Sequence, residues 1–500
     1  MAKAIMIQGT MSNVGKSLIT GGLCRIFKQD GYNVAPFKSQ NMALNSFITE
    51  DGLEMGRAQV MQAEAAGIQP DVKMNPILLK PTNDIGSQVI LNGDVIGTMS
   101  AMEYYKNKHK FVPAILDAYN YLAKKFDIII IEGAGSPAEI NLKTNDIVNM
   151  GMAKLAKSPV LLVGDIDRGG VFAQLIGTID LLDNDEKEYI KGMIVNKFRG
   201  DKTILQPGID MLEKKANKSV VGVIPYIHCD IDDEDSLSHR FEKRENTGLI
   251  DVVVIRLPRI SNFTDFNAFE CIEGVSLRYA EYVSDIGNPD IIIIPGTKNT
   301  INDMLWMRKN GIESKIKQCA SKGKIIFGIC GGYQMLGNTI TDYEGLEHKG
   351  TFNGMGLLPI RTIFKSNKTR NRVSGMFTNI GGILSPLKGQ RFEGYEIHMG
   401  ISEITGNCNN ISVLNSENIS KCDGANSGNV YGTYVHGIFD SANIAETIIS
   451  VILKEKGIDN SRIKAFNMNE YKNQQYDLLA DAIRNNVDMD MIYNILKEGV

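Results

Sequence analysis

The chain has 500 residues, which is more than one hydrophobic core usually spans, so we expect two or more domains. Its formal charge of −4 excludes the basic field that a nucleic-acid-binding protein needs. The seven cysteines form no Cys-x-x-Cys pair, which argues against a disulfide framework or a zinc site. No apolar run approaches membrane-spanning length, and the N-terminus leaves no room for a signal peptide. We therefore expect a cytoplasmic protein with no membrane partner.

A phosphate-binding loop is predicted near the N-terminus. Ala4–Gln8 has the pattern of a buried strand, and it leads into Gly9 to Ser17, which resembles a P-loop. The first glycine precedes Gly15 by six positions, a spacing similar to that of the dethiobiotin synthetase branch of P-loop enzymes. Backbone N–H groups are expected to cradle phosphates, Lys16 to reach the β and γ oxygens, and the Ser17 hydroxyl to ligate magnesium. The ATP-binding residues predicted here are Thr10, Ser12, Asn13, Val14, Gly15, Lys16 and Ser17.

Polar residues follow two further predicted strands and are candidates for binding the acceptor substrate. The strand 34–37 leads into a loop that starts at Lys38 and contains Asn41. The strand 76–81 carries Lys80, which we expect to be aimed the same way, and Arg57 lies in the expected helix 54–66. Ligands of open α/β sheets sit at the carboxyl ends of the strands, so these cations are expected to anchor a polycarboxylate. Ordinary surface charge and a solvated connection remain the alternatives.

Two other strand ends complete the expected nucleotide site. The apolar run 126–131 ends in Glu132, where P-loop folds hold the magnesium shell, so Glu132 is the predicted metal-side carboxylate, with a merely exposed glutamate as the alternative. The strand 193–195 ends in Asn196, which is similar to the base-reading asparagine of GTPases. Arg199 stands where their aspartate would be, so adenine is favoured over guanine. Strands alternating with helices predict a doubly wound, mostly parallel sheet.

The domain boundaries are expected at changes in composition. We predict a nucleotide-binding domain over 1–228, a polar linker over 229–248, a second α/β domain over 249–445 and a helical extension over 446–500. The acidic cluster 230–235 could hold a cation, but a charge run of this kind favours a solvated linker.

A nucleophile elbow is predicted at Cys330 in the second domain. An apolar strand precedes Gly328-Ile329-Cys330-Gly331-Gly332, and a helical pattern follows it. Such a turn presents the thiol above the sheet, and the helix N-terminus favours the thiolate. The Gly331 N–H and one from the Gly296 turn are the natural oxyanion donors. A core cysteine at a strand end is the alternative.

His436 is the predicted catalytic base. It ends the strand 431–435, where the ligands of a parallel sheet converge, while most of the other histidines lie in polar surroundings. His398 is the second candidate.

The second domain resembles class I glutamine amidotransferases. The resemblance rests on Gly-Ile-Cys-Gly-Gly-Tyr-Gln-Met-Leu-Gly at 328–337 and Tyr-Val-His-Gly at 434–437. The usual triad has Glu two residues after the histidine, but this chain has Ile438. Cobyric and cobyrinic acid amidating enzymes share that absence, so another acceptor must orient His436. Glu396 is one possibility.

Motifs from residue 2 to about residue 440 together resemble the cobyric acid synthase family. Beyond the loops above, they are 56–59, 74–81, 132–139, 164–170, 196–201 and 256–262. The resemblance implies ATP- and glutamine-dependent amidation of the b, d, e and g carboxylates of adenosylcobyrinic acid a,c-diamide, with Mg²⁺ and no tightly bound organic cofactor. The corrinoid is then a substrate, and the oligomeric state stays open. The alternatives are a cobyrinic acid a,c-diamide synthase and a P-loop regulatory ATPase with an inactive amidotransferase domain.

Overall fold

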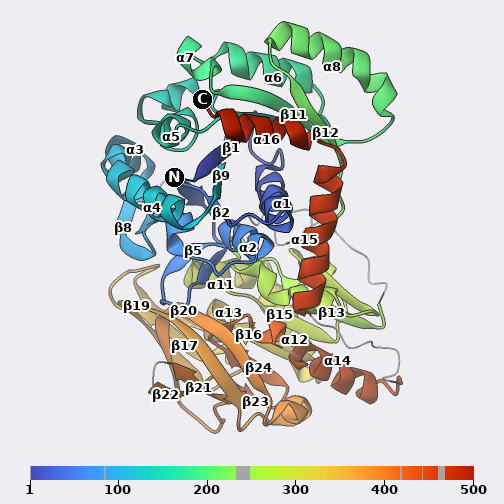
Figure 1. Cartoon of the computed structure of the whole chain (residues 1–500). Coiled ribbons are helices and arrows are strands. Elements are labelled where there is room, and N and C mark those ends of the chain that lie inside the picture. The colour runs from blue at the N-terminus through green and yellow to red at the C-terminus, as the bar shows by residue number, and fades with distance from the viewer. Residues whose placement is uncertain (1, 84–85, 232–247, 417–418, 442, 460–467) are drawn as a thin grey trace. The chain divides into compact units, whose positions relative to one another are not determined.

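The computed structural model describes residues 2–83, 86–231, 248–416, 419–441, 443–459 and 468–500. The chain forms two compact units, both of α/β type as predicted (Figure 1). Unit 1 comprises Met1–Ala43, Glu54–Glu234 and Glu470–Val500, and unit 2 comprises Leu44–Leu53 and Asp235–Asn469. Most of the predicted linker lies outside the described residues, including the acidic cluster from residue 232 onward.

Unit 1 is built on a parallel sheet of mostly apolar and mostly buried strands. Every neighbouring pair in it is parallel, which confirms the predicted doubly wound class. In spatial order its strands are β12 (Val220–Pro225), β11 (Ile190–Phe198), β10 (Val160–Asp165), β1 (Lys3–Gly9), β9 (Ile128–Glu132) and β2 (Val34–Phe37). Helices alternate with these strands along the chain: α1 (Lys16–Gln29), α2 (Arg57–Ala66), α3 (Ala101–Asn107), α4 (Val112–Lys125), α5 (Met150–Ala156), α6 (Val171–Asp180), α7 (Asn184–Lys187) and α8 (Lys202–Ala216).

A second, smaller sheet in unit 1 carries Lys80. Its order is β3 (Gln40–Met42), β6 (Ile77–Asn83), β7 (Gly86–Leu91) and β8 (Asp94–Ser100). β6 pairs parallel with β3, so the strand of Lys80 belongs to this smaller sheet and not to the main one. β6 pairs antiparallel with β7, which follows it directly in the chain, and antiparallel neighbours need only a short connection.

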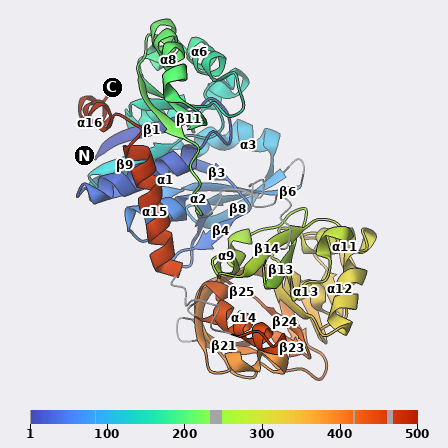
Figure 2. The same ribbon diagram turned by 90° about the vertical axis from the view of Figure 1, so that its right-hand side faces the viewer.

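The two last helices belong to unit 1. α15 (Met468–Arg484) and α16 (Met489–Glu498) bury Leu479, Ile483 and Ile492 in the core that α1 and β1 share, and Figures 1 and 2 show α15 beside α1. Arg25 of α1 is ion-paired with Asp477 at 2.7 Å. The predicted 446–500 extension is therefore not one body, because α14 (Ile444–Glu455) belongs to unit 2.

Unit 2 combines a largely parallel sheet with an antiparallel one. The first runs β14 (Val275–Ala280), β13 (Ile250–Ile255), β15 (Ile291–Ile294), β16 (Ile325–Ile329), β24 (Val430–Thr433) and β23 (Ala425–Ser427), and only β23 is antiparallel to its neighbour among these described strands. The second runs β18 (Gly350–Asn353), β17 (Thr339–Asp342), β19 (Ile360–Phe377), β20 (Arg391–Ile404) and β25 (Val435–His436). β21 (Ser412–Ser416) also pairs with β19, and β22 (Ile419–Asp423) pairs with β21. Its remaining helices are α9 (Asn267–Glu270), α10 (Val283–Ile286), α11 (Thr300–Lys309), α12 (Ile312–Ser321) and α13 (Gly331–Leu336).

Residues 44–53 belong to unit 2 although their neighbours in sequence belong to unit 1. The predicted first domain, 1–228, had included them. Their short strand β4 (Ser46–Ile48) contacts β19 and β20, and β5 (Glu54–Gly56) follows it in unit 1.

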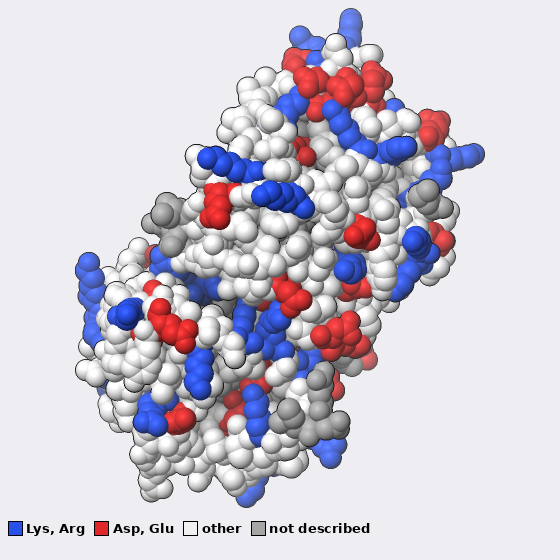
Figure 3. All heavy atoms as spheres, turned by 90° about the vertical axis from the view of Figure 1, so that its left-hand side faces the viewer, with Lys and Arg blue, Asp and Glu red and all other residues white. Residues whose placement is uncertain are grey.

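Acidic and basic side chains are intermixed over the face shown in Figure 3, in keeping with the small formal net charge of −4. In the part of the chain that the structure describes, no helix is both long and apolar enough to cross a membrane.

Candidate functional site

The loop between β1 and α1 has the backbone of a phosphate cradle. Gly15 has φ 97°, in the left-handed region that favours glycine, and a Cβ there would lie 2.3 Å from the Asn196 amide nitrogen. That amide donates to the Val14 carbonyl at 2.7 Å, so Asn196 holds the backbone of the loop in place. Lys197, which follows Asn196 in the 196–201 motif, donates to the Asn13 carbonyl at 2.6 Å and pairs with Asp165 at 2.9 Å.

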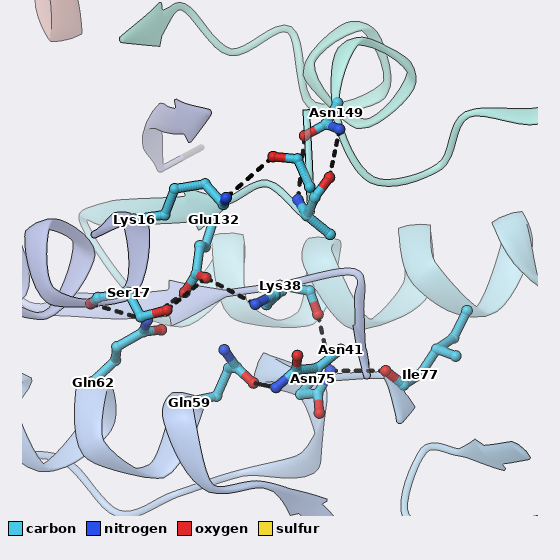
Figure 4. A network of polar contacts seen from close by, with 12 residues as sticks. Lys16, Ser17, Lys38, Asn41, Gln59, Gln62, Asn75, Ile77, Glu132 and Asn149 are labelled. Carbon is cyan, nitrogen blue, oxygen red and sulfur yellow. Dashed lines mark hydrogen bonds and ion pairs between the residues drawn. The ribbon is translucent and has the colours of Figure 1, made fainter. Parts of the chain in front are cut away.

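Lys16 and Ser17 begin α1 at the mouth of this loop. The Lys16 ammonium donates to the carbonyls of Met11 at 3.0 Å and Gly135 at 3.1 Å, so backbone oxygens of two loops hold it. Figure 4 shows Lys16 beside Ser17 and Glu132. The Ser17 hydroxyl donates to Glu132 at 2.9 Å. The hydroxyl and the carboxylate are oxygen donors of the kind that Mg²⁺ prefers, so they fit a magnesium site.

Glu132 is the centre of a buried polar cluster (Figure 4). One of its oxygens accepts from Ser17 and from the Lys38 ammonium, the latter at 2.8 Å, and the other accepts from the Gln62 amide at 2.5 Å. A buried carboxylate is costly unless it is paired, and Lys38 supplies the opposite charge. Gln62 lies on α2, and nothing in its local sequence marks it, because only the fold brings α2 beside the end of β9.

The other predicted substrate residues lie in separate polar contacts. The Asn41 amide donates to Gln59 at 3.1 Å, beside the Lys38 cluster in Figure 4. Arg57 is 3.8 Å from Glu64, and Lys80 is 2.6 Å from Glu54. Arg57 and Lys80 are largely buried against carboxylates of their own unit, so they are not ordinary surface charges.

Asn75, which lies in the 74–81 motif, holds the Lys38 loop in place. Its amide nitrogen donates to the carbonyls of Lys38 at 3.2 Å and Ile77 at 2.9 Å, and its oxygen accepts from the Gly56 N–H at 3.0 Å (Figure 4). It thus connects three segments that carry predicted site residues.

Cys330 occupies a strained turn between β16 and α13, as an elbow requires. Its φ is 51° and its ψ −106°, an unfavourable conformation for a residue with a side chain. A Cβ on Gly332 would lie 1.9 Å from the Ile294 carbonyl oxygen, and one on Gly328 would lie 2.7 Å from the Gly332 backbone. Both flanking glycines are therefore needed for the turn to pack on the sheet.

His436 is hydrogen-bonded to a carboxylate that the sequence did not predict. Its Nδ1 lies 2.6 Å from Asp265 Oδ2, and the other Asp265 oxygen accepts from the Gly437 N–H at 3.2 Å. Burial lowers the pKa of His436, but the charge and hydrogen bond of Asp265, together with the Cys330 side chain, raise it from 6.5 to about 10. Cys330, His436 and Asp265 thus form the arrangement of nucleophile, base and orienting acid.

Glu396 and His398, the alternative residues for this site, make other contacts. Glu396 is 2.8 Å from Lys421 and 3.5 Å from His398, and it makes no described bond to His436. The His398 ring stacks on Tyr434, with the ring centroids 3.8 Å apart, and its Nδ1 bonds to the Gly400 carbonyl. Asp265 could not be found from the sequence, because it lies 171 positions before His436 in a short 3₁₀ turn without a motif.

The two predicted oxyanion donors lie in the elbow and in the neighbouring turn 295–297. Gly331 is the first residue of α13, and the first N–H groups of a helix have no acceptor within it. A Cβ on Gly331 would approach the Thr297 N–H at 3.3 Å, and one on Gly296 would lie 3.0 Å from His436 Cε1. The Gly296 turn therefore borders both the elbow and the histidine.

Comparison with known proteins agrees with these two units. Residues 5–237 match the CobQ/CobB/MinD/ParA nucleotide binding domain, and residues 251–444 match the CobB/CobQ-like glutamine amidotransferase domain. Cobyric acid synthase of Ruminiclostridium cellulolyticum is 60% identical over 100% of this chain and 98% of its own length. The chain belongs to the cobyric acid synthase family. The enzyme of Lachnoclostridium phytofermentans is 57% identical with both chains covered in full, and that of Clostridium acetobutylicum is 53% identical over 98% of each chain.

Membership in this family makes the chain an amidoligase with a glutamine amidotransferase domain, acting by amidation in cobalamin biosynthesis. The nucleotide-binding match covers the phosphate loop, and the amidotransferase match covers Cys330, His436 and Asp265.

Replacing Asp265 with asparagine is expected to lower glutamine hydrolysis about a hundredfold or more. The raised pKa keeps the His436 imidazolium protonated up to about pH 10, and without the carboxylate charge burial lowers that pKa again. The alkaline loss of activity should therefore move from near pH 10 to lower pH. The measurement is the pH profile of kcat for glutamine hydrolysis. An unchanged alkaline limb would show that Asp265 does not control this imidazole.

Proposed function

We propose that the protein uses ATP and glutamine to amidate the b, d, e and g carboxylates of adenosylcobyrinic acid a,c-diamide, giving adenosylcobyric acid. The observation that carries this proposal is the presence in one chain of a Cys330, His436 and Asp265 triad and of a phosphate loop with Ser17 beside Glu132. The relatives that match over full length support the choice of acceptor.

The unit 2 triad would release ammonia. His436 takes the proton of the Cys330 thiol, and the sulfur attacks the side-chain amide carbon of glutamine. The N–H groups of Gly331 and Gly296 stabilise the oxyanion. The His436 imidazolium gives its proton to the departing ammonia. Water then hydrolyses the thioester to glutamate, which restores the thiol. Asp265 holds the imidazole in the correct tautomer for both proton transfers.

The unit 1 site would activate the acceptor. A carboxylate does not react with ammonia because its leaving group would be oxide, but transfer of the ATP γ-phosphoryl group to it gives an acyl phosphate that does. The backbone of the loop from Thr10 to Gly15 would hold the phosphates, and Lys16 would leave its carbonyl partners to neutralise them. Mg²⁺, held by Ser17 and Glu132, would supply further charge neutralisation at the phosphates.

We further propose that Lys38, Asn41, Arg57 and Lys80 bind the acceptor. The support is their burial within unit 1 and, for Lys38, its place 2.8 Å from Glu132. An incoming acceptor carboxylate or phosphate would compete with Glu132 for the Lys38 ammonium. Adenine is the proposed base, and Asn196 contributes to the nucleotide site by bracing the loop.

The decisive experiment is mass spectrometry of products formed with ATP, magnesium, glutamine and adenosylcobyrinic acid a,c-diamide. Stepwise carboxylate-to-amide mass changes are expected until all four remaining positions are converted. A parallel reaction with cobyrinic acid tests the a,c-diamide synthase alternative, because that enzyme would amidate only the a and c positions. No amide product from either acceptor, with ATP hydrolysis intact, would favour the regulatory ATPase instead.

A further inference from the structure

Residues 44–53, which we call the strap, come from the front half of the sequence but are part of unit 2. They separate two unit 1 segments along the chain, and they follow directly the polar loop that starts at Lys38. The strap strand β4 contacts β19 and β20 of the antiparallel sheet. Unit 2, which holds the triad, thus includes residues that precede its match to the amidotransferase domain, since that match begins at residue 251.

Four buried residues tie the strap to unit 2 through a closed set of hydrogen bonds. The Asn45 side-chain oxygen accepts from the Asn262 N–H at 2.7 Å, and the Ser46 N–H donates to the Asn262 side-chain oxygen at 3.3 Å. The Asn262 amide then donates to the Tyr395 hydroxyl at 2.8 Å, and that hydroxyl donates to the Ser46 carbonyl at 3.1 Å. Phe47 adds an aromatic contact, with its ring centroid 5.6 Å from that of Tyr395.

The two unit 2 residues that hold the strap, Asn262 and Tyr395, are its anchors, and each is a neighbour of a triad residue. Asn262, held at φ 53°, immediately precedes the 3₁₀ turn Phe263–Phe266 that presents Asp265 to His436. Tyr395 is the cross-strand neighbour of His436, and their rings stack with centroids 5.3 Å apart and planes 18° apart. The strap is therefore connected to the turn that carries Asp265 through Asn262, and to the His436 ring through Tyr395.

The buried Asn45 side chain combines an unpaired amide nitrogen with a hydrogen-bonded oxygen. Its side-chain nitrogen is buried and has no hydrogen-bond partner among the described residues. An unpaired buried donor destabilises a fold, so packing alone would favour an apolar residue here. The oxygen of the same side chain, by contrast, satisfies the Asn262 N–H at the start of the turn.

We propose that the strap positions the His436 and Asp265 pair, and that Asn45, Asn262 and Tyr395 are positioning residues for glutamine hydrolysis. The proposal rests on the proposed function in taking Cys330 as the nucleophile. None of the three residues takes part in a bond change. Their effect is on the orientation of the imidazole, and loss of orientation lowers kcat more than it changes KM.

The test uses the full-length chain and two variants that weaken the strap. Tyr395→Phe removes the hydroxyl but keeps the ring beside His436, and Asn45→Ala removes the acceptor for the Asn262 N–H. Each is expected to lower kcat for glutamine hydrolysis about tenfold without a comparable change in KM. Each should also move the alkaline limb of the pH profile to lower pH, because a misplaced Asp265 stabilises the imidazolium less.

Thr49→Ala is the matched control, since it removes a 3.2 Å bond to the Leu53 carbonyl within the strap and touches neither anchor. Amidation supported by ammonium shows in each variant that the chain is folded. If Tyr395→Phe and Asn45→Ala match Thr49→Ala in kcat and pH profile, the positioning role is refuted. If Cys330→Ala still hydrolyses glutamine, the proposed function itself fails, so the two failures are distinguishable.

Discussion

Cys330→Ala is expected to abolish amidation with glutamine while added ammonium still supports it. The variant lacks the sulfur that forms the thioester, so glutamine hydrolysis should fall on the order of 10⁴-fold or more. In the proposed function the acceptor is activated in unit 1, which the substitution does not change. The measurement compares amide formation with glutamine and with ammonium chloride as the nitrogen source, at equal ATP and acceptor.

Cys422→Ala is the matched control, because that thiol is exposed and lies on β22 of the same unit. It should retain both nitrogen sources. Loss of ammonium-dependent amidation in Cys330→Ala, with Cys422→Ala fully active, would contradict a division of labour between the two units. Glutamine-dependent amidation at the control level would contradict the assignment of the nucleophile.

Lys16→Ala is expected to abolish amidation with either nitrogen source and to leave basal glutamine hydrolysis in place. The variant loses the ammonium that lies over the phosphate loop, 3.0 Å from the Met11 carbonyl, and charge stabilisation of a transferring phosphoryl group is worth about 10²- to 10³-fold or more. ATP-dependent amide formation and glutaminase activity are measured on the same preparation.

Lys3→Ala provides the comparison, since Lys3 begins the strand that leads into the loop and its exposed ammonium donates to the Lys497 carbonyl. It should keep the amidation rate. Amidation retained by Lys16→Ala would refute the phosphate-loop assignment, and a simultaneous loss of glutaminase activity would show that the substitution disturbs more than the nucleotide site.

The parallel sheet of unit 1 and the Cys330 elbow were predictable because their signals are local. Runs of apolar residues such as Ile128–Ile131 are buried on both faces, and glycines beside Cys330 mark a turn that no larger residue could make. In the same way, Gly15 and Lys16 follow a strand and open a helix within a few positions of each other.

Residues that meet only through the fold could not be placed. Gln62 of α2 bonds to Glu132 at the end of β9. The strand of Lys80 pairs with β7 in the smaller sheet and not with a strand of the main sheet. The helices at the end of the chain bury Leu479 and Ile483 in unit 1, a choice that their amphipathic pattern alone does not specify.

By itself the sequence determined the two chemical centres, a phosphate loop and an elbow thiol with a strand-end histidine, since each depends on neighbours within a few residues. Only the tertiary structure decided that Asp265 orients His436 and that residues 44–53 complete unit 2. A hydrogen bond of 2.6 Å depends on where two distant segments pack, and that distance carries no signature in either segment alone.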